Sequence, residues 1–524
     1  MKIVKSIDIT ESDYLSKTTK DYLLGKSDNK IFPANPSLQL IYDKSLKKNF
    51  SKDQRKNLVE ILLSQYKKDN IQLTKTSKVY KNITSLENEN IFTCTTGQQI
   101  HIFLGPLFFI YKVKSLLKLV KLFNDKNYST KAVPVFWMAS EDHDLDEISF
   151  VKLYGKEFRW NTESGNAVGR INCKGLPELI AELENRADKT PENEKLYSLL
   201  KKYYNSSNTL SAATRGILHE LFEESGLIIL NPDDTELKKN AIDIFEKELE
   251  NKIIYNTAKE QYSLLKKEGY KPVLNPQKVN YFWLENDKRY KIKESDEGEY
   301  ELSGKRKITK QEILKSPEKL SPNVLARPIY QEVILPNIVY VAGSTEIEYW
   351  LLLTHTFQNF GIQFPVLMLR DSAFLLNEKI YNAIKKLKLS PDDFLMNQEV
   401  IIKKINNKTN NKLNKIDKKL YNVVERINQI TSEMILLGFE KSKVEEMVKD
   451  IKSDVIKLKN NSLFIEQSIA FDKNISESII KIKNKFFNSK QERIYFFIEY
   501  PELFNYLSMS YFTEFESKLY FISK

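Results

Sequence analysis

The chain has 524 residues, of which 41% are apolar, and its 81 basic and 70 acidic side chains give a net charge of +11. This length supports one large core with appendages, or two to three domains. Because Cys94 and Cys173 are the only cysteines, a disulfide framework and a four-cysteine zinc site are both excluded. The first residues do not form a signal peptide, and no apolar run reaches the ~18 residues that span a bilayer. We therefore expect a cytoplasmic protein.

The basic excess is explained for the most part by a solvated lysine surface. It also allows an anionic ligand, such as a phosphate or a carboxylate, to bind. Nucleic acid is the weaker interpretation of the same charge.

Residues 1–90 form a charged segment that we expect to be helical and to pack on the sheet that follows. Residues 91–148 then predict a strand at 91–95, a helix from Gly105 and Pro106 to residue 123, and a strand at 133–139. Proline suits the first turn of a helix, where its missing N–H is not needed. The second strand is a continuous apolar run, which is typical of a buried parallel strand.

Strands and helices alternate again further along the chain, after two inserted segments. This alternation predicts an α/β fold with a doubly wound parallel sheet. The expected elements are a hairpin at 150–153 and 157–160, helices over 176–225, a strand at 227–230, a helix at 236–252, a small β region at 270–312, a strand at 338–341, a helix at 346–357 and a strand at 365–369.

Residues 400–486 carry apolar side chains at alternating steps of three and four, which is the pattern of a coiled coil. Gly438 lies between the two runs, so the helices are expected to fold back as an antiparallel hairpin with arms of roughly 40 Å. A hairpin of this length leaves apolar surface, and we expect it to pack against a second copy. The aromatic tail is expected to dock on the main domain. The two runs are Leu413, Ile416, Leu420, Val423, Ile427, Ile430 and Met434, then Val444, Val448, Ile451, Val455, Leu458, Ser462, Ile465 and Ile469, and the tail contains Tyr495, Phe496, Phe497, Tyr500, Phe504, Tyr506, Tyr511 and Phe512.

Two polar clusters follow the strands of the segment 91–148. Gly97, Gln98 and Gln99 follow the first strand, and residues 141–144 follow the second. Ligands bind beyond the carboxyl ends of the strands in open α/β sheets. If the two strands are neighbours, both clusters face one crevice.

His143 lies between Glu141, Asp142 and Asp144, and the chain has only four histidines. Neighbouring carboxylates raise the pKa of a histidine, which would make His143 a proton carrier near neutral pH. Carboxylates and imidazole also bind divalent metals. The alternative is a solvated helix cap, in which Asp142 or Asp144 accepts backbone N–H groups.

Other candidate ligand-binding groups are single residues. Residues 96–99 match neither a Walker loop nor the glycine fingerprint of dinucleotide-binding folds. Lys112 would reach an anion from its helix, although a helical lysine is usually just solvated. Arginines would hold a carboxylate in a fork, although each arginine alone is more often part of a surface ion pair. Gly343 and Glu346 lie at a loop-to-helix junction that favours anions, where Glu346 is alternatively a simple cap. The arginines concerned are Arg170, Arg327 and Arg370.

Together these segments resemble the BshC family, which is assigned to the cysteine-adding step of bacillithiol synthesis. The resemblance spans nearly the whole chain, and its departures are Ala342, Ser344 and Thr345 in a loop that is richer in glycine in the family, and Asp371 in place of asparagine. The matching residues are Thr96, Gly97, Gln98, Gln99, Gly105, Pro106, Tyr111, Lys112, Pro134, Val135, Phe136, Trp137, Glu141, Asp142, His143, Asp144, Gly226, Leu227, Asp233, Asn275, Pro276, Asn280, Leu320, Ser321, Pro322, Asn323, Arg327, Pro328, Gln331, Glu332, Leu335, Pro336, Tyr340, Val341, Gly343, Glu346, Ile347, Tyr349, Trp350, Gln491, Glu492 and Arg493.

The resemblance implies a Rossmann-like core similar to class I nucleotidyl transferases, small α/β insertions and a C-terminal antiparallel coiled coil that forms a homodimer. It implies a ligase that joins the carboxyl group of cysteine to the amine of glucosaminyl-malate. Amide formation from a free carboxylate needs activation, most simply by a nucleotide such as ATP or ADP, and the sequence leaves the activating group open. The implied boundaries are 1–148 for a lead-in and the first half of the core, 149–225 for a first insertion, 226–269 for more core, 270–320 for a second insertion, 321–390 for the end of the core, 391–486 for the coiled coil and 487–524 for the tail.

We therefore expect His143, backed by Asp142 or Asp144, to take a proton from the attacking amine. Arg327 or Arg370 would hold the malate carboxylates. The competing classes are a non-enzymatic coiled-coil scaffold and an RNA-binding protein. The candidate site residues are Glu141, Asp142, His143 and Asp144 for catalysis, and Gly97, Gln98, Gln99, Lys112, Asn280, Arg327, Gln331, Gly343, Glu346, Tyr349 and Arg370 for substrate binding; no metal ligand is assigned.

Overall fold

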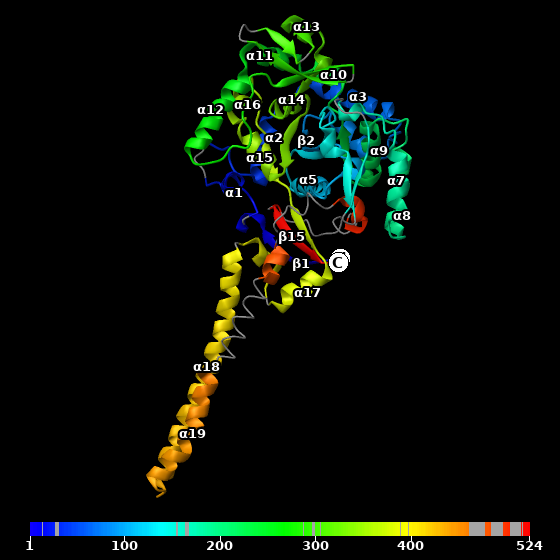
Figure 1. Cartoon of the computed structure of the whole chain (residues 1–524). Coiled ribbons are helices and arrows are strands. Elements are labelled where there is room, and N and C mark those ends of the chain that lie inside the picture. Colours follow the sequence, from blue (N-terminus) through cyan, green and yellow to red (C-terminus); the bar gives the residue numbers. More distant parts are fainter. Residues whose placement is uncertain are drawn as a thin grey trace. The chain divides into compact units, whose positions relative to one another are not determined.

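A computed structural model of the chain divides into two compact units (Figure 1). One unit contains Met1 and residues 6–374 and 491–520, and the other contains residues 2–5, 375–490 and 521–524. The structure describes residues 1–12, 14–26, 31–153, 156–162, 167–286, 288–295, 299–303, 305–387, 389–396, 398–460, 477–483, 496–503, 515 and 517–523, without the side chains of residues 405–417 and 458–460.

A five-stranded parallel sheet forms the centre of the first unit, with the order β13-β12-β2-β3-β6. The predicted α/β class with a parallel sheet is thereby confirmed. From β2 the chain adds β3 and then β6 on one side. It later adds β12 and then β13 on the other side, so the strand order reverses between β2 and β12. The strands are β2 (Ile91–Gln98), β3 (Lys131–Met138), β6 (Ile228–Leu230), β12 (Asn337–Ala342) and β13 (Val366–Leu369).

The strands of this sheet are largely buried because both faces of the sheet are covered. In β3 every residue after Lys131 is buried, and the same holds for the middle of β2. β2 extends to Gln98, so Gly97 and Gln98 belong to the strand end and not to the following loop. Cys94 is fully buried in β2 and its pKa is raised by burial, in agreement with its expected role as a small apolar residue.

Helix α5 (Phe108–Asn124) connects β2 to β3 and packs on β2, β3 and β12. The Asn124 side chain fixes the end of the helix, because it accepts a hydrogen bond from Ala132 N and donates one to Ala132 O, both at 2.8 Å. Further helices contact the same sheet: α2 (Leu38–Lys47) lies against β12 and β13, α4 (Lys78–Ser85) and α9 (Leu210–Phe222) against β6, and α15 (Ser344–Leu351) against β12 and β13.

The two predicted β insertions are present. β4 (Phe150–Leu153) pairs antiparallel with β5 (Lys156–Arg159), which confirms the expected hairpin. The second insertion is an antiparallel sheet with the order β10-β9-β8-β7-β11. Its strands are β7 (Tyr281–Glu285), β8 (Lys288–Glu294), β9 (Tyr300–Leu302), β10 (Arg306–Ile308) and β11 (Leu320–Pro322).

Three expected elements are wrong in detail. The segment 1–90 begins with a strand, β1, which joins β15 and β14 in a short sheet. The helix expected at 346–357 is broken into α15 and α16, because Leu351, Leu352 and Leu353 are all fully buried and a straight helix would turn one of them to solvent. The helix expected at 236–252 is likewise split, into α10 and α11. These elements are β1 (Lys2–Asp8), α10 (Thr235–Lys239), α11 (Ile242–Asn251), α16 (Thr354–Phe360), β14 (Ser372–Leu376) and β15 (Lys518–Ser523).

The remaining helices of the first unit surround this core. Among the described residues, no helix is both long and apolar enough to cross a membrane. The helices are α1 (Lys17–Leu23), α3 (Lys52–Lys68), α6 (Leu145–Ile148), α7 (Leu176–Glu184), α8 (Pro191–Tyr203), α12 (Ile253–Lys267), α13 (Lys310–Lys315) and α14 (Ala326–Ile334).

The second unit contains α17 (Glu378–Lys386) and two longer helices, α18 (Gln398–Leu436) and α19 (Lys441–Asn460), which contact each other. Gly438, with φ of +93°, lies in the turn between them, at a backbone angle that favours glycine. The coiled coil itself stays a prediction. The predicted positions Leu413, Ile416, Leu458, Ser462, Ile465 and Ile469 lie outside the described residues or side chains, as do Tyr495, Phe504, Tyr506, Tyr511 and Phe512 of the tail.

Two residues of the aromatic tail pack in the first unit. Phe496 and Phe497 are buried, and Phe497 N donates a hydrogen bond to Gly105 O at 3.1 Å. The tail therefore contacts the loop that leads into α5.

Candidate active site

Polar segments follow the central strands of the sheet at one edge. Because β12, β2 and β3 are parallel neighbours, their carboxyl ends lie side by side. Gly97 and Gln98 end β2, residues 140–144 follow β3, and Gly343 follows β12. The strand order reverses between β2 and β12, which is where ligands bind in open α/β sheets.

Lys112 and Glu346 form an ion pair between the ends of β2 and β12. Lys112 Nζ also donates to Gly97 O and Gln98 Oε1, both at 2.9 Å. The Glu346 carboxylate accepts further hydrogen bonds from Tyr340 Oη at 2.9 Å and Gly343 N at 2.8 Å. Glu346 is thus a helix cap, one of the two alternatives that the sequence left open. The Glu346 carboxylate satisfies Lys112, the Tyr340 hydroxyl and Gly343 N. In this arrangement these donors do not fit the phosphate groups of a nucleotide.

Gly97 lies where a side chain would be tightly packed against its neighbours. A Cβ atom there would lie 3.3 Å from Trp137 Cβ and 3.3 Å from the Tyr340 hydroxyl. The absence of a side chain lets β2, β3 and β12 approach closely next to Lys112.

A second cluster lies beyond the end of β3. Asp142 pairs with Arg327 from α14 and lies 3.6 Å from Arg289 Nη1 of β8. Arg289 Nη1 is also 3.1 Å from His143 Nδ1. The loop that carries Asp142 is held by main-chain hydrogen bonds from Val168 N to Asp142 O and from Gly169 N to Ser140 O, each 2.7 Å long. Two arginines and one histidine therefore meet around one carboxylate.

The pKa of His143 differs from the expectation. Burial and the neighbouring Arg289 charge lower the pKa of His143 below its ordinary value of 6.5, and they outweigh Asp142 and Asp144, which act in the opposite direction. The predicted increase in pKa is therefore wrong, because the sequence revealed neither the burial of His143 nor its contact with Arg289. A pKa below 6.5 leaves His143 neutral at pH 7, with its charge appearing only in acid.

Glu141 points into a buried charge network. Lys238 Nζ from α10 lies 2.6 Å from Glu141 Oε1 and 3.0 Å from Asp233 Oδ1, and its side chain is 0% exposed. Arg170 holds Asp233 in a fork, at 2.6 Å and 2.8 Å. Burial raises the pKa of Glu141 despite Lys238, whereas Lys238 and Arg170 hold the pKa of Asp233 well below its ordinary value although burial opposes them. Through Glu141, this buried network holds the loop that follows β3.

Tyr349 of α15 connects the two clusters electrostatically. Burial, followed by the charge of Glu346, raises the pKa of Tyr349, while Arg327 acts in the opposite direction. Arg370 follows β13, and its guanidinium donates to Asp371 O at 2.9 Å and Ser372 Oγ at 2.7 Å. Arg370 Nε is 3.8 Å from where a Cβ of Gly343 would lie, which brings Arg370 to the same edge.

Three predicted site residues bond to other partners. Gln99 donates to Glu147 of α6 at 3.0 Å. Asn280 is fully buried, where it donates to Glu248 at 3.1 Å and accepts from Asn323 at 3.0 Å. Gln331 donates to Glu332, which accepts a hydrogen bond from Asn337 at the amino end of β12. Asp144 is exposed at the start of α6 and makes no side-chain cap there.

The sequence did not identify Arg289, Lys238 or Tyr340 as site residues. Lys238 resembled a solvated helix lysine, and Arg289 lay in a strand of an insertion. Arg289 meets His143 and Asp142 from a distant segment, and Lys238 likewise meets Glu141, although its other partner, Asp233, is only five residues away. Among the residues that the structure describes, no three His, Cys, Asp or Glu side chains are grouped to hold a metal ion.

Comparison with known proteins identifies the family. Residues 1–371 match the family model for "Bacillithiol biosynthesis BshC, N-terminal Rossmann-like domain". The chain is 37% identical to "Putative cysteine ligase BshC" of Flavobacterium johnsoniae over 409 residues, which are 77% of this chain and 76% of that protein. It is 36% identical to the protein of the same name from Christiangramia forsetii over 412 residues, 76% of each chain. The protein of that name from Bacillus cytotoxicus is 28% identical over 401 residues, 74% of this chain and 71% of that protein. The chain belongs to the BshC family of bacillithiol biosynthesis.

Proposed function

We propose that this chain is a cytoplasmic ligase that joins the carboxyl group of L-cysteine to the amine of glucosaminyl-malate, the last step of bacillithiol biosynthesis. The observation that carries the proposal is the meeting of Arg289, Arg327 and His143 at the carboxyl edge of a parallel sheet, in a chain whose relatives are named cysteine ligases. The parallel core also supports the inferred likeness to class I nucleotidyl transferases.

The charge at this edge suits a malate group. Malate has two carboxylates, and arginine recognises a carboxylate through parallel hydrogen bonds. Arg327 keeps 25% of its side chain exposed while it pairs with Asp142, so it has access to a ligand. We therefore assign Arg327 to the malate, and place His143 next to the groups that react.

Joining a free carboxylate to an amine also requires an activating group, most simply a nucleotide. Since Glu346 already satisfies Lys112 and Gly343 N, we assign no residue to that group. The residues of this chain contribute by binding the malate and by orienting the amine near the acyl carbon.

The proposal is tested by mixing the purified chain with L-cysteine, glucosaminyl-malate and ATP, and measuring bacillithiol by mass spectrometry. Omission of each component provides the controls. Restoration of the thiol in a deletion strain by this chain is the matching result in cells. Absence of the thiol in both experiments, together with salt-sensitive RNA binding, would favour the RNA-binding alternative.

Arg327→Met is expected to weaken the binding of glucosaminyl-malate about 10–100-fold, because a charged hydrogen bond contributes roughly 1.5–3 kcal/mol. Calorimetry measures the Kd directly. Arg306→Met is a matched control, since Arg306 lies at an exposed position of strand β10 and pairs with Glu312 of α13. Equal Kd values for the wild type and Arg327→Met would remove Arg327 from the site.

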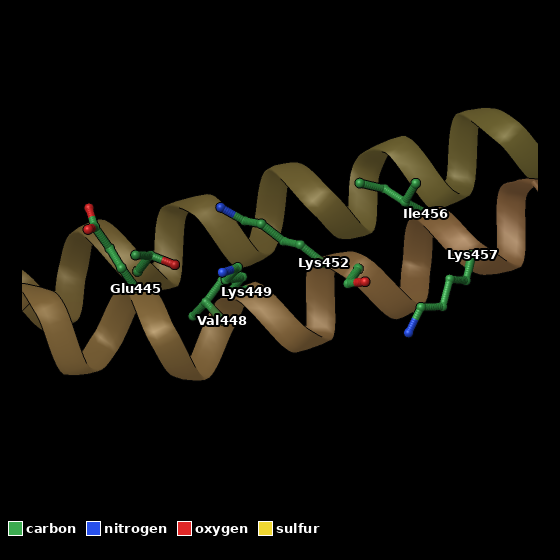
Figure 2. Close-up of a pocket in the computed structure, with 8 residues that line it drawn as sticks. Glu445, Val448, Lys449, Lys452, Ile456 and Lys457 are labelled. Atoms are coloured by element: carbon green, nitrogen blue, oxygen red, sulfur yellow. The ribbon is translucent and has the colours of Figure 1, made fainter.

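We further propose that α18 and α19 form a coiled coil that joins two copies of the chain. Apolar side chains on this hairpin are exposed, with Ile430 at 45%, Ile451 at 52% and Met447 at 68%. A groove of about 670 Å³ runs along the hairpin, lined by Val448 and Ile456 together with lysines (Figure 2). A second copy would cover this apolar surface, as the alternating spacing of the apolar residues favours.

The double variant Ile430→Lys/Ile451→Lys is expected to be a monomer, since buried lysines without partners oppose association. Light scattering after gel filtration gives the mass. Glu446→Lys, which adds positive charge at an exposed position of α19 outside the apolar spacing, should remain a dimer. A monomeric wild-type chain would contradict this assembly.

A further inference from the structure

The guanidinium of Arg289 is held in one orientation by Ser321, Pro322 and Phe282. Its Nε donates to Ser321 Oγ at 3.0 Å and its Nη2 donates to Pro322 O at 3.1 Å. The Phe282 ring lies 3.9 Å from its central carbon, and only 4% of the side chain is exposed. Nη1 is thereby directed toward His143 and Asp142.

This orientation determines which nitrogen of His143 bears hydrogen. A guanidinium has donors only, so at the 3.1 Å contact the Nδ1 atom of His143 must accept. A neutral imidazole whose Nδ1 accepts carries its hydrogen on Nε2. A protonated imidazole would turn an N–H toward the Arg289 N–H groups, which is unfavourable.

The groups around His143 come from three segments. Asp142 and Asp144 flank it in its own loop, Arg289 reaches it from β8, and the Phe282 ring of β7 has its centroid 5.6 Å from that of the imidazole. At Nδ1 the ring therefore meets a donor, the guanidinium of Arg289. Because His143 is exposed, its Nε2 atom is the nitrogen that remains for a ligand.

We propose that Arg289 is a positioning residue that holds His143 as the Nε2–H tautomer, so that the imidazole donates a hydrogen bond to an oxygen of the bound substrate. This replaces the role of proton acceptor that the sequence indicated, because the only lone pair of the neutral ring faces Arg289. The identity of the substrate rests on the proposed function, whereas the tautomer is a property of the chain alone.

The test is nitrogen NMR on the full-length chain with ring-¹⁵N histidine and without substrate. The chain has four histidines, so few signals arise, and the signals absent from His143→Asn identify His143. Near pH 7.5 we expect a protonated Nε2 and an unprotonated Nδ1. In Arg289→Met we expect a mixture of tautomers and a rise in the pKa of His143 toward 6.5.

The signals of His101, His219 and His355 report whether Arg289→Met is folded. If the variant does not fold, the wild-type spectrum still decides. A wild-type His143 that is charged near pH 7.5, or that carries its hydrogen on Nδ1, would overturn the proposal, as would a folded Arg289→Met chain with an unchanged His143 spectrum. The NMR experiment uses no substrate, so its result does not depend on the ligase assay. The proposed tautomer of His143 and the proposed ligase activity can therefore be contradicted independently.

Discussion

Replacing Lys238 by methionine is expected to lower the free energy of unfolding by about 3–5 kcal/mol, the cost of leaving buried charges without their partner. Lys238 Nζ lies within 3.0 Å of both Glu141 and Asp233, and it also donates to Glu318 O at 3.1 Å. The side chains of Glu141 and Asp233 are only 6% and 7% exposed, so water compensates little for the lost charge, although Asp233 keeps Arg170. Methionine fills a similar volume but provides no charge.

Urea unfolding followed by circular dichroism measures this loss. Lys239→Met is the matched control, because the adjacent Lys239 is 53% exposed and pairs with the exposed Glu236 at 2.9 Å. The control should change the free energy of unfolding by less than about 0.5 kcal/mol. Adding Glu141→Gln to Lys238→Met should recover part of the loss. Equal stability of the two lysine variants would show that the buried network does not hold the loop after β3.

Replacing His143 by alanine is expected to lower the rate of bacillithiol formation about 10²–10³-fold, the typical effect of removing one donor from an oxygen that becomes negative in the transition state. Because His143 is exposed, the free energy of unfolding should be nearly unchanged. Steady-state product formation at saturating substrate separates the loss of kcat from a change in KM.

His355→Ala is the control for this variant, since His355 lies in α16 and not at the edge of the sheet where His143 is found. It should retain the wild-type rate. A fully active His143→Ala would exclude any chemical role for His143, whether as donor or as base.

The parallel core could be predicted from the sequence because β3, β6 and β13 are largely apolar runs. β3 and β12 lie within one or two residues of their expected positions. The breaks between α10 and α11, and between α15 and α16, could not be predicted in this way. They depend on how consecutive buried side chains fit the core, as with Leu351, Leu352 and Leu353.

The candidate site was predictable only in part. The rule that ligands bind at the carboxyl ends of parallel strands placed Gln98, His143 and Gly343 at one edge. The partners of His143 and Glu141 were not predictable, because Arg289 reaches His143 from β8 and Lys238 reaches Glu141 from α10. Burial, followed by the charge of Arg289, lowers the pKa of His143, so the increase inferred from the neighbouring carboxylates alone was wrong in direction.

A crystal structure of the chain with glucosaminyl-malate tests the account most directly. We expect the malate carboxylates within hydrogen-bond distance, about 3 Å, of the Arg327 guanidinium, and the sugar next to His143 Nε2. A ligand bound to a different surface, with Arg327 and His143 both out of reach, would contradict the proposal that the strand ends form the active site.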